Sequence, residues 1–175
     1  LDLIARLDDV QSGRVLIAST DVRSVALADL HARIVLLRQD SPVFLDTIRN
    51  NLLIADPHAG DADLWQALEA VHLAATVRAL PDGLETLLGE DATTLSSGQA
   101  RRLCLARTML SRAPIVLLDE PTSGLDRETE RGILEALPRL FPGRTVVMAT
   151  HATLPADPHL RRLALRDGKL EETSR

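Results

Sequence analysis

The chain has 175 residues, of which 45% are hydrophobic and 26% are charged, and this balance excludes an intrinsically disordered protein. Its net charge of −5, without any basic block, argues against a nucleic-acid partner. No apolar run approaches the roughly 18 residues that cross a bilayer, so we expect any membrane-spanning part to lie outside this sequence.

Residues Leu1–Leu7 open in a helical pattern without a methionine, so we expect the sequence to begin inside a longer chain. Short β-branched or leucine-rich runs predict strands at Arg14–Ala18, Ile34–Leu37, Ile115–Leu118 and Thr145–Ala149. Apolar side chains at helical spacing predict helices over Leu64–Leu73, Gln99–Arg112 and Arg127–Leu140. Asp61 or Asp63 is a plausible N-cap of the first helix, and Pro142-Gly143 stops the last.

Strands without alternation, separated by helices, indicate an α/β fold with a mostly parallel sheet covered on both faces. Residues 40–112 carry helical patterns and almost no strand signal. We therefore interpret them as a helical subdomain inserted into an α/β core of residues 1–39 and 113–175. Cys104, the only cysteine, lies in a helical pattern and is predicted to be a small buried residue.

Two adjacent carboxylates, Asp119 and Glu120, end the predicted strand Ile115–Leu118, and Pro121 prevents its continuation. Ligands of parallel sheets bind beyond the carboxyl ends of the strands, so both acids should point into that crevice. Nucleotide hydrolysis needs a carboxylate for Mg²⁺ and a group that orients or deprotonates water. Asp119 suits the first role and Glu120 the second, although a solvated strand end fits this short pattern equally well.

The segment Leu95-Ser-Ser-Gly-Gln99 precedes a predicted helix, where Ser96 and the amides near Gly98 could donate to a phosphate. Taken alone, an ordinary cap by Ser96 or Ser97 is the better interpretation. Three further features are individually uninformative: the loop Ser123–Asp126, His151 after the strand Thr145–Ala149, and Gln39 after Ile34–Leu37.

In this order, the five features together resemble the ATP-binding-cassette (ABC) family, as its Q-loop, signature motif, Walker B motif, D-loop and H-loop. The resemblance implies a P-loop NTPase-like fold that binds ATP and Mg²⁺. It also implies a second such domain, which would close head to tail on the first and share two ATP molecules with it.

The resemblance assigns roles to named residues. Asp119 and Gln39 would hold or sense Mg²⁺, Glu120 would polarise water, and His151 would contact the γ-phosphate. Asp126 would help to link the two ATP sites. The partner's nucleotide would be bound by the signature residues, which are Ser96, Ser97, Gly98 and Gln99.

The segments Ser41–Asn50 and Leu84–Glu90 are similar to exporter-type ABC proteins, and they speak against a soluble ABC ATPase of DNA repair or translation. Exporters carry a membrane-spanning domain, here expected upstream, and their ATPase domains lie on the cytoplasmic face of the plasma membrane. Among exporters, Asn51–Asp56 and Ala113–Asp126 look most like subunits of the heterodimeric cysteine/glutathione exporters.

The chain departs from the family in two respects. Ser97 stands where glycine is common and adds a Cβ and a hydroxyl at a close-packed position, so we expect phosphate contact to be reduced or altered rather than lost. No G-x-x-x-x-G-K-[ST] occurs in the sequence, so we expect the phosphate loop and the strand that feeds it to precede Leu1. The alternative is a non-catalytic subunit that lends its signature motif to a partner, but Glu120 and His151 favour an ATPase.

Overall fold

The structure, a computed structural model, describes residues 1–89, 95–157 and 160–172. Its centre is a sheet of three parallel strands in the order β3 (Ile34–Leu37), β4 (Ile115–Asp119) and β5 (Thr145–Ala149). Ile115 pairs with Ile34 on one side and with Thr145 on the other. The predicted α/β class, its parallel sheet and all three of these strands are confirmed.

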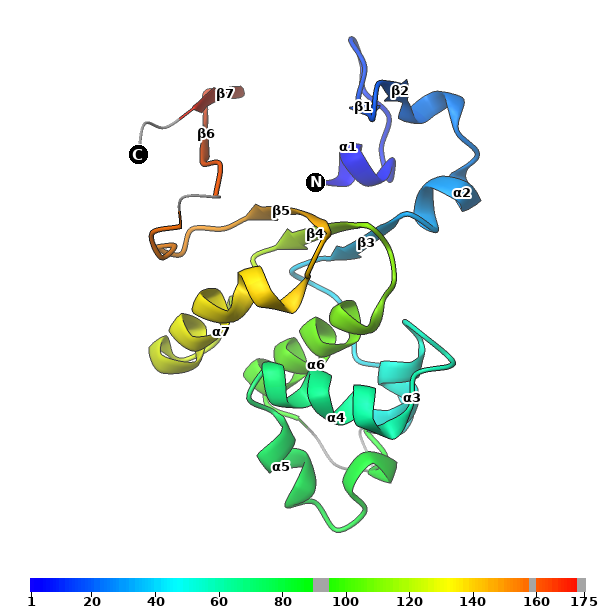
Figure 1. The fold of residues 1–175 in the computed structure, drawn as a ribbon, viewed down its shortest axis with the longest axis vertical. Helices are drawn as coiled ribbons and strands as arrows, with labels where there is room; N and C mark the ends of the chain where they lie inside the picture. The colour runs from blue at the N-terminus through cyan, green and yellow to red at the C-terminus, as the bar shows by residue number, and fades with distance from the viewer. Residues whose placement is uncertain (90–94, 158–159, 173–175) are drawn as a thin grey trace.

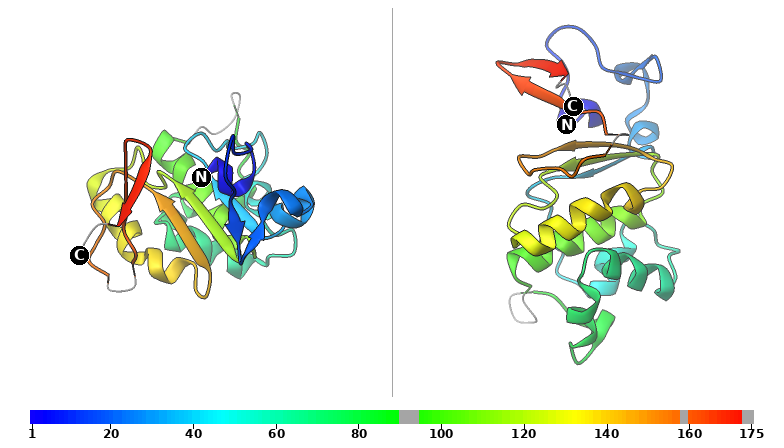
Figure 2. Two further views of the ribbon diagram at one scale, coloured as in Figure 1. Left: turned by 90° about the horizontal axis from the view of Figure 1, so that it is seen from above. Right: turned by 60° about the vertical axis from the view of Figure 1, so that its left-hand side comes forward.

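Helices cover one face of this sheet. Figures 1 and 2 show α6 (Ser97–Leu110) and α7 (Arg127–Leu140) lying beneath the strands. Three shorter helices pack beyond α6: α3 (Ile48–Leu53), α4 (Asp61–Ala70) and α5 (Ala74–Arg78). The helices of the predicted 40–112 subdomain thus gather on one side of the sheet, while the bounds of that subdomain stay a prediction.

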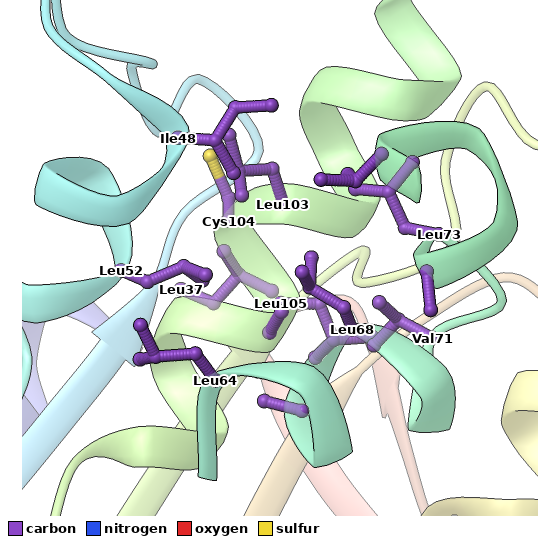
Figure 3. Packing of buried hydrophobic residues seen from close by; sticks show 14 of the residues in the cluster. Leu37, Ile48, Leu52, Leu64, Leu68, Val71, Leu73, Leu103, Cys104 and Leu105 are labelled. Carbon is purple, nitrogen blue, oxygen red and sulfur yellow. The ribbon is translucent and has the colours of Figure 1, made fainter. Parts of the chain in front are cut away.

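The helix α6 lies at the centre of the main core. Leu103, Cys104 and Leu105 are at most 1% exposed, and side chains from α3, α4 and β3 surround them (Figure 3). Burial raises the pKa of the Cys104 thiol, as expected for the predicted buried cysteine. The helical spacing within the predicted helix Gln99–Arg112, carried by Leu103, Ala106, Arg107 and Leu110, indicates a single apolar stripe. That stripe is too narrow, because partners on several sides bury α6 almost all round.

The other face of the sheet is covered only in part. The N-terminal elements pack over β3 and β4, where Ala5, Val22 and Leu30 meet Ile34 and Leu117 in a second, smaller core. These elements are α1 (Asp2–Ala5), β1 (Leu16–Ile17), β2 (Thr20–Asp21), a 3-10 turn (Val22–Ser24) and α2 (Leu27–His31). They do not extend over β5, whose residues alternate between exposed and half-buried, so the prediction of two covered faces is wrong for β5.

Two local predictions also need correction. The predicted strand Arg14–Ala18 is only the two-residue β1, paired antiparallel with β2. The N-cap of α4 is Gly60 rather than Asp61 or Asp63, and the Asp63 carboxylate instead accepts the Gly60 amide hydrogen at 3.0 Å. A carboxylate in the first turn thus satisfies a free amide from inside the helix.

The sequence patterns did not indicate the C-terminal hairpin of β6 (Leu163–Arg166) and β7 (Lys169–Glu172). Its residues are exposed at nearly every position, so it has no apolar face to produce an alternating pattern. The available signal was the turn Asp167-Gly168, whose φ angles of 48° and 75° are typical of a two-residue hairpin loop.

Candidate functional site

The carboxyl ends of the three parallel strands bring together four of the predicted site residues. Gln39 follows β3, and Asp119 ends β4 beside Ala149, the last residue of β5. Glu120 comes directly after β4, and His151 follows β5. A cavity of about 470 Å³ opens there, and it is lined by Arg38, Gln39, Asp40 and Asp119. Since parallel strands all end at the same edge, Gln39 and Asp119 line one cavity although they lie far apart in the sequence.

Glu120 is held in an unusual backbone conformation. Its φ angle is 45°, in the left-handed region that non-glycine residues rarely occupy, and its amide donates to the Ala149 carbonyl at 2.9 Å. Its carboxylate accepts the His151 amide hydrogen at 3.0 Å and the Thr150 hydroxyl at 3.4 Å. These bonds hold the carboxylate between β4 and β5 with one fifth of its side chain exposed.

The His151 ring lies in solvent beside this carboxylate. Its side chain is fully exposed, and Nε2 lies 3.7 Å from Glu120 Oε1. The backbone of His151 therefore orients Glu120, while the ring can turn toward a ligand over the strand ends.

The signature segment forms the N-terminus of α6. Ser96 is the N-cap, and its hydroxyl accepts the Gln99 amide hydrogen at 3.2 Å, while the Gln99 side-chain oxygen accepts the Ser96 amide hydrogen at 2.9 Å. This capping box leaves the amides of Ser97 and Gly98 in the first turn, where a helix supplies no acceptor. Ser97 itself is exposed, so the expected close packing around its side chain is not found within this chain.

The signature segment also lies against the Ser123–Asp126 loop. A Cβ added to Gly98 would come within 3.3 Å of Leu125 Cδ2 and 3.4 Å of the Gly124 carbonyl oxygen, so glycine permits this close approach. Asp126 caps α7 by accepting the amide hydrogens of Glu128 and Thr129. These bonds, chiefly that from the Thr129 amide, lower the pKa of the Asp126 carboxyl.

The sequence patterns missed Arg101, whose guanidinium donates to the carbonyl oxygens of Arg38 and Asp119 from within α6. A signal existed, because residues 101, 104, 105 and 108 share one helix face and all four are buried. An arginine on a buried helix face requires a polar partner, and here that partner is the strand ends.

The chemistry of the cavity fits Mg²⁺. The Asp119 carboxylate and the Gln39 side chain offer oxygen ligands in one cavity, and Mg²⁺ is commonly bound by one or two carboxylates together with substrate phosphates. Within residues 1–89, 95–157 and 160–172, no cluster of three or more His, Cys, Asp or Glu residues could hold a metal. In that same part of the chain, no helix is both long and apolar enough to span a bilayer.

Comparison with known proteins agrees with this geometry. The protein family described as ABC transporter matches residues 1–123. The chain is 36% identical, over 98% of its length, to an ATP-dependent lipid A-core flippase of Desulfotalea psychrophila. It is 39% identical, again over 98% of its length, to the mitochondrial iron-sulfur clusters transporter ATM1 of Yarrowia lipolytica.

A solved structure of a bacterial Atm1-family ABC exporter with ATP bound has a similar fold. It superposes with a TM-score of 0.78 and 34% sequence identity, over 86% of this chain and 26% of the exporter chain. The chain spans 30% of the length of the D. psychrophila flippase and 24% of that of the Y. lipolytica transporter.

Proposed function

The chain belongs to the ABC transporter family, and from this premise we propose that it is the ATP-hydrolysing domain of an exporter that moves a solute across a membrane. The observation that carries the proposal is the Glu120 carboxylate, held by Thr150 and His151 at the edge that also bears Asp119 and Gln39. An ABC ATPase needs a carboxylate so placed to act on water beside the γ-phosphate.

In the proposed reaction, water attacks the γ-phosphate of ATP and releases ADP and inorganic phosphate. Glu120 orients the water and accepts its proton, and the exposed His151 ring contacts the γ-phosphate. Asp119 and Gln39 would hold Mg²⁺, which when bound neutralises charge on the phosphates. The two bonds on the Glu120 carboxylate fix its direction before substrate arrives.

A second ABC ATPase domain is the proposed partner at the signature segment. The amides of the first turn of α6, capped by Ser96, form a donor group that suits a phosphate. In a head-to-tail dimer this group would face the partner's ATP, with Ser97 and Gln99 beside it and Asp126 linking the two sites.

A membrane-spanning domain of the same subunit is the proposed second partner, on the cytoplasmic face of the plasma membrane. The length of the relatives supports it, because the chain covers only 24–30% of the curated proteins described above. Exposed apolar side chains in the segment that follows Gln39, and Leu87 paired with Thr47 of that segment, supply a surface for it. Phe44 is 45%, Leu45 80% and Leu87 56% exposed. The exporter-like segment Leu84–Glu90 contributes Leu87 to this surface, and its last residue, Glu90, lies outside the described residues.

The transported solute is a finer proposal. The relatives bear the names of a lipid A-core flippase and an iron–sulfur cluster transporter, whereas Asn51–Asp56 and Ala113–Asp126 resemble thiol exporters. We propose cysteine or glutathione. ATP-dependent uptake of labelled cysteine or glutathione into inverted vesicles would support it, and uptake no greater than with Glu120→Gln would contradict it.

The test of the ATPase proposal is Glu120→Gln in the full-length protein that contains this chain. The variant keeps the shape of the side chain but cannot accept a proton, so we expect hydrolysis to fall at least about 100-fold while ATP stays trapped in a closed dimer. Glu135→Gln, on the exposed face of α7, is the matched control and should leave hydrolysis unchanged. Unchanged hydrolysis in Glu120→Gln would refute the role of Glu120.

The same measurement addresses the alternative of a non-catalytic subunit. In that case the wild-type site would contribute no hydrolysis, and Glu120→Gln would leave the turnover of the assembled transporter as it was. Ser96→Ala would then lower turnover at the partner's site alone.

A further inference from the structure

Arg101 lies in the second turn of α6 and is only 7% exposed. Its guanidinium reaches the ends of two neighbouring strands. Nη1 donates to the carbonyls of Arg38 and Gln39, and Nη2 donates to those of Asp119 and Glu120. A single side chain thus holds the backbone at the points where β3 and β4 pass into the candidate site.

Burying the Arg101 guanidinium carries a free-energy cost. Burial lowers the pKa of the guanidinium, and the nearby carboxylates of Asp119, Glu120 and Asp40 oppose this only in part. Within the described residues, the buried Nε has no hydrogen-bond partner. Arg144 shares both features, so burial alone does not set Arg101 apart. What distinguishes Arg101 is that its guanidinium donates to the carbonyls at the ends of two strands.

The carbonyls that Arg101 holds also shape the turns that follow the strands. The Arg38 carbonyl accepts the Ser41 amide hydrogen at 3.2 Å, and the Glu120 carbonyl accepts the Ser123 amide hydrogen at 3.1 Å. Glu120 has a φ angle of 45°, a conformation that persists only where its surroundings enforce it. Arg101 supplies one of these constraints, on the carbonyl side of Glu120.

We propose that Arg101 is a positioning residue that clamps the ends of β3 and β4 to the signature helix and so sets Gln39 and Glu120 for reaction. This inference rests on the proposed ATPase function. The helix that carries Arg101 is capped by Ser96, so the clamp joins the surface offered to the partner's ATP to the acids of this chain's own site. A shift of α6 would therefore be transmitted to Glu120 through one guanidinium.

The test uses three variants of the full-length protein. Arg101→Met removes the donors, and Arg101→Lys keeps the charge but cannot reach both strand ends with a planar fork. Arg144→Met is the matched control. Arg144 is also partly buried and donates to a carbonyl, that of Met109, but it precedes β5 at the opposite edge of the sheet.

Two measurements are made on each variant. Steady-state ATP hydrolysis should show kcat reduced roughly 10- to 100-fold in Arg101→Met, with KM for ATP changed less than about threefold, since displacement of reacting groups by about 1 Å has effects of this size. Hydrogen exchange should be faster at the amides of Ser41 and Ser123, whose acceptors Arg101 holds. Arg101→Lys should resemble Arg101→Met in both measurements, and Arg144→Met should resemble the wild type.

The outcomes separate this inference from the proposed function. Wild-type kcat in Arg101→Met, wild-type protection of both amides, or full activity in Arg101→Lys would each overturn the role of Arg101. If Arg101→Met does not fold, Arg101→Lys decides the question by the same exchange measurement. If the wild-type protein hydrolyses no ATP, the proposed function fails, and the exchange result still tests whether Arg101 holds the strand ends.

Discussion

Hydrogen bonds from backbone amides orient two acidic side chains around the site. The carboxylate of Glu120 accepts the His151 amide hydrogen, and that of Asp126 accepts the amide hydrogens of Glu128 and Thr129. A carboxylate held in this way is pre-oriented without help from a second charged side chain. The two carboxylates differ in role. Glu120 lies at the strand ends, whereas Asp126 caps the N-terminus of α7.

Asp126 should make the stability of the chain depend on pH in acid solution. Its pKa in the folded state is lowered from 3.8, mainly by the Thr129 amide. A lowered pKa means that the carboxylate stabilises the fold above about pH 3.8 and loses this contribution as the pH falls through the folded-state pKa. The free energy of unfolding, measured by urea titration, should therefore decline more steeply with acid in wild type than in Asp126→Asn.

Asn can still cap the helix but does not titrate, so this variant isolates the ionisation of Asp126. Parallel stability curves for the two proteins down to acid pH would show that Asp126 makes no ionic contribution.

At the scale of the element, α6 determines how the site is assembled. Its N-terminus forms the signature cap, its second turn carries Arg101, and its middle packs against the sheet, α3 and α4. One helix thereby connects the main core to both groups of site residues.

Leu105→Ala should be among the more damaging core substitutions in this helix. Leu105 is fully buried at the centre of the main core, so we expect a loss of about 2–5 kcal/mol in the free energy of unfolding. Leu45→Ala is the control, because Leu45 is 80% exposed and its removal should change stability by less than about 0.5 kcal/mol. Equal effects in the two variants would contradict the observed packing.

Ser96→Ala tests the N-cap of the same helix. Loss of the hydroxyl leaves the Gln99 amide without its acceptor and should cost about 1 kcal/mol in thermal or urea unfolding. Ser97→Ala provides the comparison, since Ser97 is exposed and is not the cap. A cap at Ser97 instead would reverse the order of the two effects.

In the molecule as a whole, both outer strands of the sheet are edge strands within the described residues. β3 and β5 each pair with β4 alone, and the residues of β5 are exposed in alternation. The site residues nevertheless reach their places, because β3, β4 and β5 keep a continuous parallel register. The ends of these strands present carboxylates and polar side chains, but few cationic side chains that could neutralise the charge of a phosphate.

The isolated 175-residue chain should therefore bind Mg-ATP weakly and hydrolyse none. It contains a single lysine, Lys169, in the C-terminal hairpin, and no glycine-rich phosphate loop. Without such a loop, neither backbone amides nor a lysine surround the β- and γ-phosphates. Calorimetry on the isolated chain should show no micromolar affinity for Mg-ATP, and a micromolar dissociation constant would contradict this expectation.

Local sequence patterns predicted much of the fold. The three parallel strands were identified because buried strands in an α/β protein are short apolar runs with sharp polar ends. Asp119 and Glu120 were placed at a strand end for the same reason. The hairpin of β6 and β7 was missed because it is exposed on both faces and leaves no periodic signal.

Residue types at fixed spacing along the chain were enough to indicate the family, the strand ends and the candidate acids. How these residues meet depends on the packing of the folded chain. Only the packing of α6 under the sheet brings Arg101 to the carbonyls of Asp119 and Gln39, and only the pairing of β4 with β5 places the His151 amide on Glu120. Contacts between residues 31 or more positions apart, as between Glu120 and His151, or Arg101 and Gln39, depend on packing that no local pattern encodes.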